Sequence, residues 1–393
     1  MDSTSLYLAG TKKIDWARAN CPLLGRIAAG FRETKPFAGL TIGVSLHIEK
    51  KTAVLFQTLQ AGGAHVVATG NLGTTQDDVA LALNTLGIKV YGKRDDTPHE
   101  HLDNVREVLR HKPDLLLDNG ADLTALAVGE PEFPLDSIRG GTEETTSGGH
   151  RMREDLAGRI PFPVIVINDS PLKLIVENKH GVGQGAVESF YRITNLMIQG
   201  KQVAVLGYGW VGRGIAKYFR DFGAHVQVVE PDPIRALEAA VDGFRVATID
   251  AAVGRASVIL TATGRPNVIA AAHFPRMRDG VVLGNTGHFD HEIDTGALRE
   301  QATAREVLEP GIERFRLENG RHVTLLCGGR MYNLGGVEAK GNPIEVMDMG
   351  FALQARSLEA LATGSTGLIP GPQSPPRTID ESLARAMVEV MMA

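Results

Sequence analysis

The residues with the clearest chemistry are the glycines Gly207, Gly209 and Gly212, which are spaced as G-x-G-x-x-G. They follow an apolar run that begins at Val203, and an acid, Glu230, ends the next apolar run. In such a motif the first glycine permits a tight turn, the second lets a pyrophosphate approach the backbone, and the third allows close contact between helix and strand. A carboxylate at the position of Glu230 accepts hydrogen bonds from ribose hydroxyls and repels a 2′-phosphate. The pattern predicts a site for NAD rather than NADP.

A strand, a helix and a second strand are needed to hold these residues, and residues 203–232 have that order of apolar and amphipathic segments. The alternative is a glycine turn that serves only packing. Further strands are expected at residues 39–44, 64–68, 115–117, 164–167, 258–262, 280–284 and 323–327, with a helix at 52–60. The alternation predicts an α/β protein with two doubly wound parallel-sheet domains, one a Rossmann NAD-binding domain, and a hinge between them.

The expected domain organisation has four parts. They are a substrate-binding domain at residues 1–168, the Rossmann domain at 169–330, a return segment at 331–365, and a proline-rich linker with a C-terminal helix at 366–393. The run PGPQSPP from Pro370 to Pro376 predicts a stiff, exposed linker. Residues 379–392 have helical periodicity and could pack on a neighbouring surface.

The composition limits the classes of partner. The chain has 393 residues, of which 43% are hydrophobic and 22% charged, which is typical of a globular protein with an ample core. The net charge is −5, and no Lys/Arg cluster is interleaved with aromatics, so we expect a small-molecule substrate and no nucleic-acid partner. Cys21 and Cys327 are the two cysteines. Without a signal-like N-terminus or a long apolar run, we expect a cytoplasmic protein that does not bind membranes.

Seven sequence blocks resemble S-adenosylhomocysteine hydrolase, in the same order and over nearly the whole chain. They are LHIEKKTAVL from Leu46, TTQDD from Thr74, EETTSGGH from Glu143, INDSPLKLIVEN from Ile167, GYGWVGRG from Gly207, TGHFDHEID from Thr286 and GGRMYNLG from Gly328. The resemblance implies a two-domain α/β enzyme whose substrate domain closes over a tightly held NAD, assembled as a homotetramer or homodimer. In that family NAD takes a hydride from the 3′-carbon of a nucleoside. The ketone then acidifies the 4′-hydrogen, and the 5′ substituent leaves by elimination.

This chemistry needs a base at the 3′-hydroxyl and an acid at the leaving group. A lysine can serve as the base when burial and a neighbour tune it, and Lys173 is at the matching family position. Glu177 stands four residues on, where the family more often has aspartate, and shares a face with Lys173 if the segment is helical. Without the resemblance, the two would be interpreted as a surface ion pair. Histidine suits the acid role, and His47 and His288 match the family histidines at that end of the pocket.

The resemblance assigns other polar side chains to the substrate and the cofactor. On the substrate side, Thr74 is an expected substrate contact and Glu144 matches an acid that holds a ribose hydroxyl. The expected ribose or NAD contacts are Thr145, Thr146, Ser147, Asn168, Asn178, Thr263, Gly264 and, near the nicotinamide amide, Asn333. No metal is expected. The ETTS run also predicts a helix cap, and the Thr-Gly pair a turn.

Four departures from the family pattern concern the substrate or the cofactor. Glu49 and Lys51 replace a threonine and an acid or glutamine that line the adenine pocket. Asn119, in DNGADLT, replaces an acid near the 4′-carbon, and an amide cannot act as a base. Asn342 stands at the point of a family histidine in a longer loop, and the family's C-terminal extension, which reaches a neighbouring subunit's NAD, is not recognisable.

These departures, beside an intact oxidation apparatus, lead to three hypotheses. We first expect a nucleoside dehydratase of nucleoside-antibiotic biosynthesis, of the angustmycin type, which oxidises the 3′-hydroxyl with bound NAD. It would then expel water to leave an alkene and reduce the ketone again. The alternative is a true adenosylhomocysteinase that cleaves S-adenosylhomocysteine to adenosine and homocysteine. A hypothesis of another class is a regulatory NAD-binding relative without turnover, against which the retained Lys173, His47, His288 and Glu144 argue.

Overall fold

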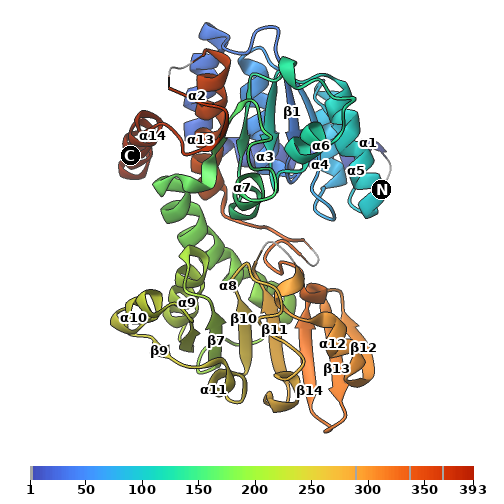
Figure 1. Ribbon diagram of the computed structural model, residues 1–393, viewed down its shortest axis with the longest axis vertical. Helices are drawn as coiled ribbons and strands as arrows, with labels where there is room; N and C mark the ends of the chain where they lie inside the picture. Colours follow the sequence, from blue (N-terminus) through green and yellow to red (C-terminus); the bar gives the residue numbers. More distant parts are fainter. Residues whose placement is uncertain (1–2, 288–289, 336–337, 365–366) are drawn as a thin grey trace. The chain divides into compact units, whose positions relative to one another are not determined.

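The computed structural model describes residues 3–287, 290–335, 338–364 and 367–393. Its contacts divide the chain into two compact units, each with its own sheet (Figure 1). Unit 1 comprises residues 1–174 and 344–393, and unit 2 comprises residues 175–343. The expectation of two α/β domains with parallel sheets is confirmed, and each unit is described by itself.

In the described part of unit 1, seven strands form a parallel sheet in the order β15-β6-β5-β4-β1-β2-β3. The strands are β1 (Thr41–Ser45), β2 (His65–Thr69), β3 (Lys89–Tyr91), β4 (Leu115–Asp118), β5 (Gly140–Glu143), β6 (Pro163–Val166) and β15 (Gly371–Gln373). The central strands are buried almost throughout, so they are near-continuous apolar runs, as expected for a parallel sheet covered on both faces.

Helices cover both faces of this sheet. They are α1 (Ser3–Ala19), α2 (Pro22–Thr34), α3 (Lys50–Ala61), α4 (Asp77–Thr85), α5 (Pro98–Arg110), α6 (Asp122–Gly129), α7 (Thr146–Arg153), α13 (Ile344–Ala362) and α14 (Arg377–Met392). α3 and α13 pack on the sheet and with α2 on one face, whereas α5 and α6 pack on the other (Figure 1). The second segment of unit 1 thus completes its core, because α13 is buried over most of its length.

The N-terminus of α2 is capped from another helix. Cys21, at the N-cap position, makes no side-chain cap bond. Instead, the backbone N–H groups of Leu23 and Leu24 donate to the Asp348 carboxylate on α13, at 2.8 and 2.9 Å. A negative charge there also complements the helix dipole.

We expect Asp348→Ala to lower the free energy of unfolding by about 1–2 kcal/mol, because it leaves these two N–H groups without their acceptor. Asp348→Asn keeps one acceptor oxygen and should lose less. Urea unfolding of both variants measures the difference. Equal stability of Asp348→Ala and the wild type would show that the cap contributes nothing.

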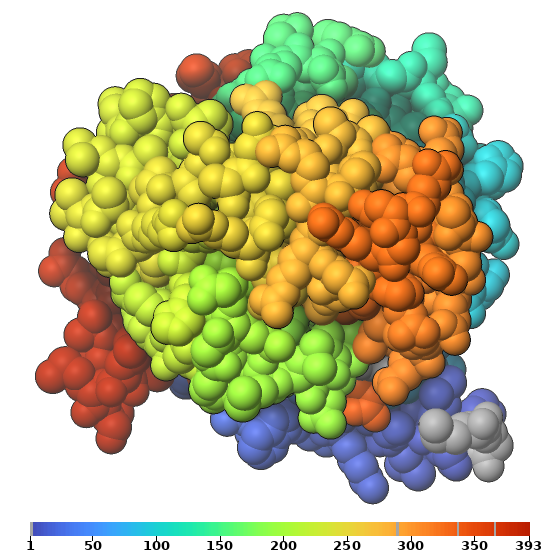
Figure 2. All heavy atoms as spheres, turned by 90° about the horizontal axis from the view of Figure 1, so that it is seen from below, coloured from blue at the N-terminus to red at the C-terminus, as the bar shows by residue number. Residues whose placement is uncertain are grey.

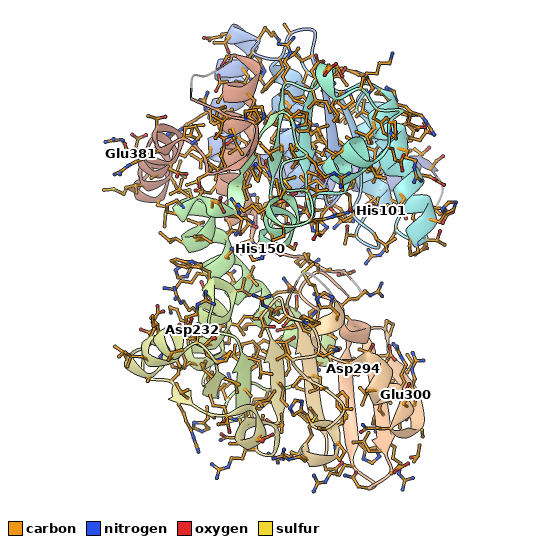
Figure 3. All side chains as sticks on the ribbon, viewed as in Figure 1. His101, His150, Asp232, Asp294, Glu300 and Glu381 are labelled. Carbon is orange, nitrogen blue, oxygen red and sulfur yellow. The ribbon has the colours of Figure 1, made fainter. Side chains whose placement is uncertain are left out.

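The exposed linker predicted at Pro370–Pro376 is in part wrong. Gly371–Gln373 forms β15, which extends the sheet in parallel register beside β6. Proline is tolerated in β15 because the strand lies at the edge of the sheet. The predicted C-terminal helix is confirmed as α14, where Glu381 is labelled in Figure 3, and it packs on α13 and α2 of its own unit.

Within the described residues of unit 2, eight strands form a sheet in the order β12-β13-β14-β11-β10-β7-β8-β9. They are β7 (Gln202–Leu206), β8 (His225–Val229), β9 (Arg245–Val246), β10 (Val258–Thr261), β11 (Val281–Asn285), β12 (Ala302–Glu309), β13 (Ile312–Leu317) and β14 (His322–Leu326). The run from β9 to β14 is parallel and has the Rossmann strand order 3-2-1-4-5-6. The β12–β13 antiparallel hairpin was not predicted, because β12 is exposed and lacks a buried apolar pattern (orange surface in Figure 2).

Among the helical segments of unit 2, η3 and α9 approach each other closely at Gly214. The segments are the π-helix η3 (Lys173–Gly181), which begins at the end of unit 1, and α8 (Val182–Thr194), α9 (Trp210–Asp221), α10 (Pro233–Val241), α11 (Ile249–Val253) and α12 (Thr295–Glu300). A Cβ on Gly214 of α9 would lie 1.9 Å from the carbonyl oxygen of Lys179, so only glycine permits this approach. Asp232, labelled in Figure 3, caps α10 by accepting from two backbone N–H groups. Among the described residues, no helix is both long and apolar enough to span a membrane.

Candidate functional site

The predicted substrate residues of unit 1 follow the carboxyl ends of its strands. β1 lies between β2 and β4, which is where the order of the strands reverses. In doubly wound sheets ligands bind outside the carboxyl ends of the strands at this switch point. His47 and Glu49 follow β1, Asn119 follows β4, and Glu144 follows β5. The fold therefore gathers residues distant in sequence at the position where a ligand is expected.

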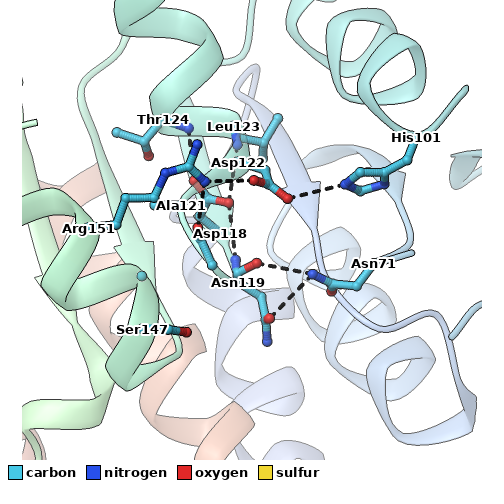
Figure 4. A network of polar contacts seen from close by, with 12 residues as sticks. Asn71, His101, Asp118, Asn119, Ala121, Asp122, Leu123, Thr124, Ser147 and Arg151 are labelled. Atoms are coloured by element: carbon cyan, nitrogen blue, oxygen red, sulfur yellow. Dashed lines mark hydrogen bonds and ion pairs between the residues drawn. The ribbon is translucent and has the colours of Figure 1, made fainter. Parts of the chain in front are cut away.

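Two of these residues, Asn119 and Glu144, are hydrogen-bonded to each other, and Lys173 is paired with the same carboxylate. The Asn119 side-chain amide donates from Nδ2 to Oε2 of Glu144 at 2.8 Å, and Nζ of Lys173 lies 3.9 Å from Oε1 of the same carboxylate. All three side chains are buried. Asn71 was not predicted, yet its Nδ2 donates to the Asn119 backbone and side-chain oxygens at 3.1 and 3.3 Å (Figure 4). Its only sequence signal is that it lies three residues before Thr74.

His47 has a defined orientation. Its Nδ1 lies 2.9 Å from Oγ1 of Thr74, and that hydroxyl donates its single proton to the carbonyl oxygen of Asn71 at 2.8 Å. This arrangement favours the tautomer in which Nδ1 carries a proton and donates it to Thr74. In that tautomer, Nε2 is the ring nitrogen that can exchange a proton with a substrate.

Glu49 and Lys51 form a pair at the start of α3. Their carboxylate oxygen Oε2 and ammonium nitrogen Nζ are 3.6 Å apart, and the Lys51 side chain is only 4% exposed. Glu49 is the N-cap residue of α3 but makes no cap bond with its side chain. A buried cation in the first turn of a helix is opposed by the helix dipole and by desolvation. Burying Lys51 here therefore costs free energy that an apolar side chain at the same position would not cost.

A further polar network fixes the turn that follows Asn119. Arg151 donates to the carbonyl oxygen of Gly120 at 3.0 Å and to Asp122 at 2.8 Å, while Nε2 of His101 lies 3.2 Å from the other Asp122 oxygen (Figure 4). Burial opposes ionisation of Asp122, but the hydrogen bonds from His101 and Arg151 outweigh it and hold its pKa below the ordinary value. Arg151 thus links the turn at Gly120 to the Asp122 carboxylate, which His101 also contacts.

The segment with Lys173 is helical, which was the condition for Lys173 and Glu177 to share a face, and the helix is of the π type. Lys173 and Glu177 are both buried on this segment. Within unit 2, Asn342 donates from Nδ2 to Oε1 of Glu177 at 3.4 Å. π-helical segments are rare and often occur at functional sites. The structure thus connects two departures from the family pattern, Glu177 and Asn342.

In unit 2 the glycine turn has the geometry of a dinucleotide site. Gly207 has φ 97°, and a Cβ on Gly212 would lie 2.0 Å from the carbonyl oxygen of Gly207. Among the described residues, a Cβ on Gly209 would meet nothing within 4 Å, and Gly209, the N-cap residue of α9, offers no side chain to its first N–H groups. Glu230 is held by the backbone N–H of Tyr208 at 2.6 Å. An open helix N-terminus beside a fixed carboxylate suits a pyrophosphate and an adenosine ribose.

Two further features of unit 2 fit NAD. Asn333 is buried, and its Oδ1 has no hydrogen-bond partner among the described residues, so a carboxamide N–H such as that of nicotinamide would satisfy it. Buried Glu292, which was not predicted, accepts from Thr263 N–H and hydroxyl and from Gly264 N–H at 2.7–2.9 Å. It fixes the loop after β10, next to the glycine turn after β7.

The glycines allow a matched test of the dinucleotide site. We expect Gly209→Ala to leave the melting temperature of the NAD-free protein nearly unchanged but to weaken NAD binding about 10²-fold, because the methyl group occupies only the ligand's space. Gly212→Ala should instead lower the melting temperature, because its methyl group overlaps the Gly207 backbone. Calorimetric titration with NAD and thermal unfolding measure both effects. Undiminished NAD affinity in Gly209→Ala would contradict the site.

The remaining predicted residues are placed as follows. Thr145 caps α7 by accepting from Gly148 N–H, as the alternative interpretation expected, while Thr146 is exposed and Ser147 half-buried in the first turn. Asn168 lies in the short helix η2 (Ile167–Asp169) after β6, and Asn178 lies in η3. His288 lies outside the described residues. No described residues form a group of three or more His, Cys, Asp or Glu able to hold a metal ion.

The fold and these sites define an NAD-dependent enzyme with a Rossmann unit and a second doubly wound unit that carries buried acid–base residues. Family models identify residues 1–133 as S-adenosyl-L-homocysteine hydrolase and residues 178–339 as the NAD-binding domain of that enzyme. The chain belongs to the S-adenosyl-L-homocysteine hydrolase family and is an NAD-dependent hydrolase of this type. NAD is its cofactor.

Individual relatives agree with this assignment. The chain is 44% identical to S-inosyl-L-homocysteine hydrolase of Methanopyrus kandleri, over 98% of this chain and 92% of the relative. It is 43% identical to adenosylhomocysteinase of Pyrococcus abyssi, over 98% and 92%. Among solved structures, a dipicolinate synthase of Bacillus halodurans is similar in fold, with 13% identity, a TM-score of 0.50, and coverage of 83% of this chain and 99% of that chain.

Proposed function

We propose that the protein hydrolyses an S-nucleosyl-L-homocysteine to the nucleoside and homocysteine, with S-inosyl-L-homocysteine as the preferred substrate. Unit 1 is the proposed substrate-binding unit. S-Adenosyl-L-homocysteine is the second candidate, because relatives of both names match the chain to a similar extent. The single observation that favours the inosyl substrate is the Glu49–Lys51 pair, whose lysine is buried.

The polarity of this pair matches a 6-oxopurine. Hypoxanthine presents an acceptor at O6 and a donor at N1–H, whereas adenine presents a donor at its 6-amino group and an acceptor at N1. The Lys51 ammonium can only donate, and the ionised Glu49 carboxylate can only accept. Lys51 would therefore pair with O6 and Glu49 with N1–H. The same two groups would meet like partners on adenine.

Hydrolysis replaces the dehydratase that we first expected from the sequence. The named relatives, which match over nearly their whole length, are hydrolases, and none of them is a dehydratase. The departures at Glu49, Lys51 and Asn119 concern base choice and the detail of proton transfer. They do not require a different leaving group.

The proposed oxidation step uses the contact between Glu144 and Lys173. Bound NAD supplies the hydride acceptor for the 3′-carbon. Lys173 takes the proton of the 3′-hydroxyl, and Glu144 accepts a hydrogen bond from a ribose hydroxyl. Because Nζ of Lys173 is 3.9 Å from the Glu144 carboxylate, both groups can reach neighbouring hydroxyls of one ribose. Glu177 lies one turn beyond Lys173 and would orient the base.

The proposed elimination step uses His47 at the 5′ end of the nucleoside. Because Nδ1 is engaged by Thr74, Nε2 delivers the proton to the departing homocysteine sulfur and then takes one from the water that adds back. His288 would assist there. Asn119 cannot take the 4′ proton, so its amide would orient Glu144, to which it donates. The Glu144 carboxylate would receive the 4′ proton as the sulfur leaves and return it when water adds, and Lys173 would return its proton when the ketone is reduced again.

The remaining proposed contacts are divided between NAD and the substrate. Glu230 would hold the adenosine ribose, Gly207 to Gly212 the pyrophosphate, and Asn333 the nicotinamide amide. The other proposed contacts are Thr145, Thr146, Ser147, Asn168, Asn178, Thr263 and Gly264 for ribose or cofactor, and Thr74 and Asn342 for substrate. We also propose that the protein acts as a homotetramer or homodimer.

The test of base choice is the ratio of kcat/KM for S-inosyl- and S-adenosyl-L-homocysteine, each measured by the appearance of free thiol. We expect a ratio of at least about 10² in favour of the inosyl substrate, because a site built to hydrogen-bond one base leaves buried groups unpaired with the other. A ratio below one would assign the protein to S-adenosyl-L-homocysteine.

A further inference from the structure

A buried acid that no step of the reaction uses lies directly behind the substrate residues of unit 1. Glu143 is fully buried at the end of β5 and precedes Glu144 in the chain. Its neighbour across the sheet is Asp118, which precedes Asn119. Two adjacent strands therefore each end in a buried acid followed by a site residue.

Glu143 binds the loops that follow both strands. Its Oε1 accepts from the backbone N–H of Gly120 at 3.0 Å, and Oε2 accepts from that of Ala121 at 2.9 Å. Oε1 also accepts from the N–H and the hydroxyl of Thr145, both at 2.7 Å. One carboxylate thus bridges the turn after Asn119 and the residue after Glu144.

The backbone conformation of the turn after Asn119 is itself unfavourable. Gly120 and Ala121 have φ 92° and 64°, and the left-handed region is unfavourable for alanine by about 1–2 kcal/mol. Close packing holds Glu143 itself, because a Cβ on Gly148 would lie 2.2 Å from its carboxyl carbon. The bridge therefore compensates for a strained turn.

We propose that Glu143 is a positioning residue that sets the Asn119–Glu144 contact by holding the turn after Asn119 against Thr145. This inference rests on the proposed function, in which Glu144 holds the ribose and Asn119 orients Glu144. Glu143 itself touches neither the substrate nor the reacting atoms.

The charges around Glu143 come from β4 and from the N-terminus of α7. Burial and Asp118 on β4 raise the pKa of Glu143, whereas its hydrogen bonds with Gly120 and Thr145 lower it and favour the ionised form. The N-terminus of α7, which begins at Thr146, also favours the anion. All four contacts of the carboxylate come from donors, so each is strongest when Glu143 is ionised.

Glu143→Gln tests the inference, because it keeps the shape but turns an amide NH₂ toward an N–H donor. We expect kcat for the nucleosyl-homocysteine to fall about 10²-fold with KM changed less than about threefold, because a displacement of about 1 Å suffices for such a loss. A crystal structure of the variant should show the Asn119 Nδ2–Glu144 Oε2 distance lengthened from 2.8 Å beyond hydrogen-bond range. NAD content should be unchanged.

Glu130→Gln, at an ion pair with Arg106 on the surface of the same unit, is the matched control and should leave kcat unchanged. If Glu143→Gln does not fold, Glu143→Asp, which keeps the charge on a shorter side chain, should show a smaller change in the same direction. Unchanged kcat, or an unchanged Asn119–Glu144 distance in a folded variant, would overturn the proposal. If the wild type is inactive on nucleosyl-homocysteines, the proposed function is refuted. The role of Glu143 is still tested in that case by the Asn119 Nδ2–Glu144 Oε2 distance in the variant.

Discussion

Replacing Lys173 by alanine should abolish the reduction of bound NAD by a nucleoside while NAD stays bound. In the proposed mechanism this lysine is the base that takes the 3′-hydroxyl proton as the hydride leaves the 3′-carbon. Its ammonium nitrogen lies 3.9 Å from Glu144, whereas the glycine turn that is proposed to hold NAD belongs to the other unit. We expect kcat to fall by about 10³-fold or more, within the range for loss of a general base.

The near-ultraviolet absorbance of reduced nicotinamide, followed after addition of inosine or adenosine, measures this step without any leaving group. Lys12→Ala, at an exposed position on α1, is the control for loss of one lysine. Wild-type rates of NAD reduction in Lys173→Ala would remove the assignment of the base. Loss of NAD from the variant would show that Lys173 serves cofactor binding instead.

The second large effect is expected from Lys51→Gln. The amide can accept a hydrogen bond from a 6-amino group, which the ammonium cannot, and it removes the charge that would pair with O6. We expect kcat/KM for the inosyl substrate to fall and that for the adenosyl substrate to rise, changing their ratio by about 10³-fold. Parallel assays of thiol release from both substrates give the ratio directly.

Lys50→Gln makes the same chemical change one residue earlier in α3 and should leave the ratio unchanged, since only Lys51 is placed in the proposed base contact. An equal loss with both substrates in Lys51→Gln would mean that the lysine stabilises α3 or Glu49 without reading the base. An unchanged ratio would exclude a base contact by Lys51.

Much of the fold could be predicted from the sequence because the buried parallel strands are apolar runs bounded by turn residues. Val203 to Asp232 contains the whole first Rossmann unit in its periodicity and its glycines. The β12–β13 hairpin could not be predicted this way, because its strands are short of buried residues and rich in charge. β15 was predicted to be a linker because proline is unusual in strands. The proline is accepted here because β15 is an edge strand and pairs only with β6.

The sequence predicted those site residues whose side chains would act as acids, bases or ligand contacts. It did not predict the residues that hold the backbone of the site in place. Lys173, Glu144 and Asn119 were predicted individually, and the structure brings them into contact. Glu143 and Glu292 were missed because their task is to accept backbone N–H groups from distant loops. A single sequence carries no sign of such pairing.

Hydrolysis of a nucleosyl-homocysteine is best tested by mass spectrometry of the products formed when the purified protein is incubated with S-inosyl-L-homocysteine, S-adenosyl-L-homocysteine and a hydroxymethyl-bearing nucleoside. We predict free homocysteine together with inosine, formed at the expense of the inosyl substrate. Loss of water from the nucleoside, without thiol release from either thioether, would refute the proposed hydrolysis and restore the dehydratase interpretation.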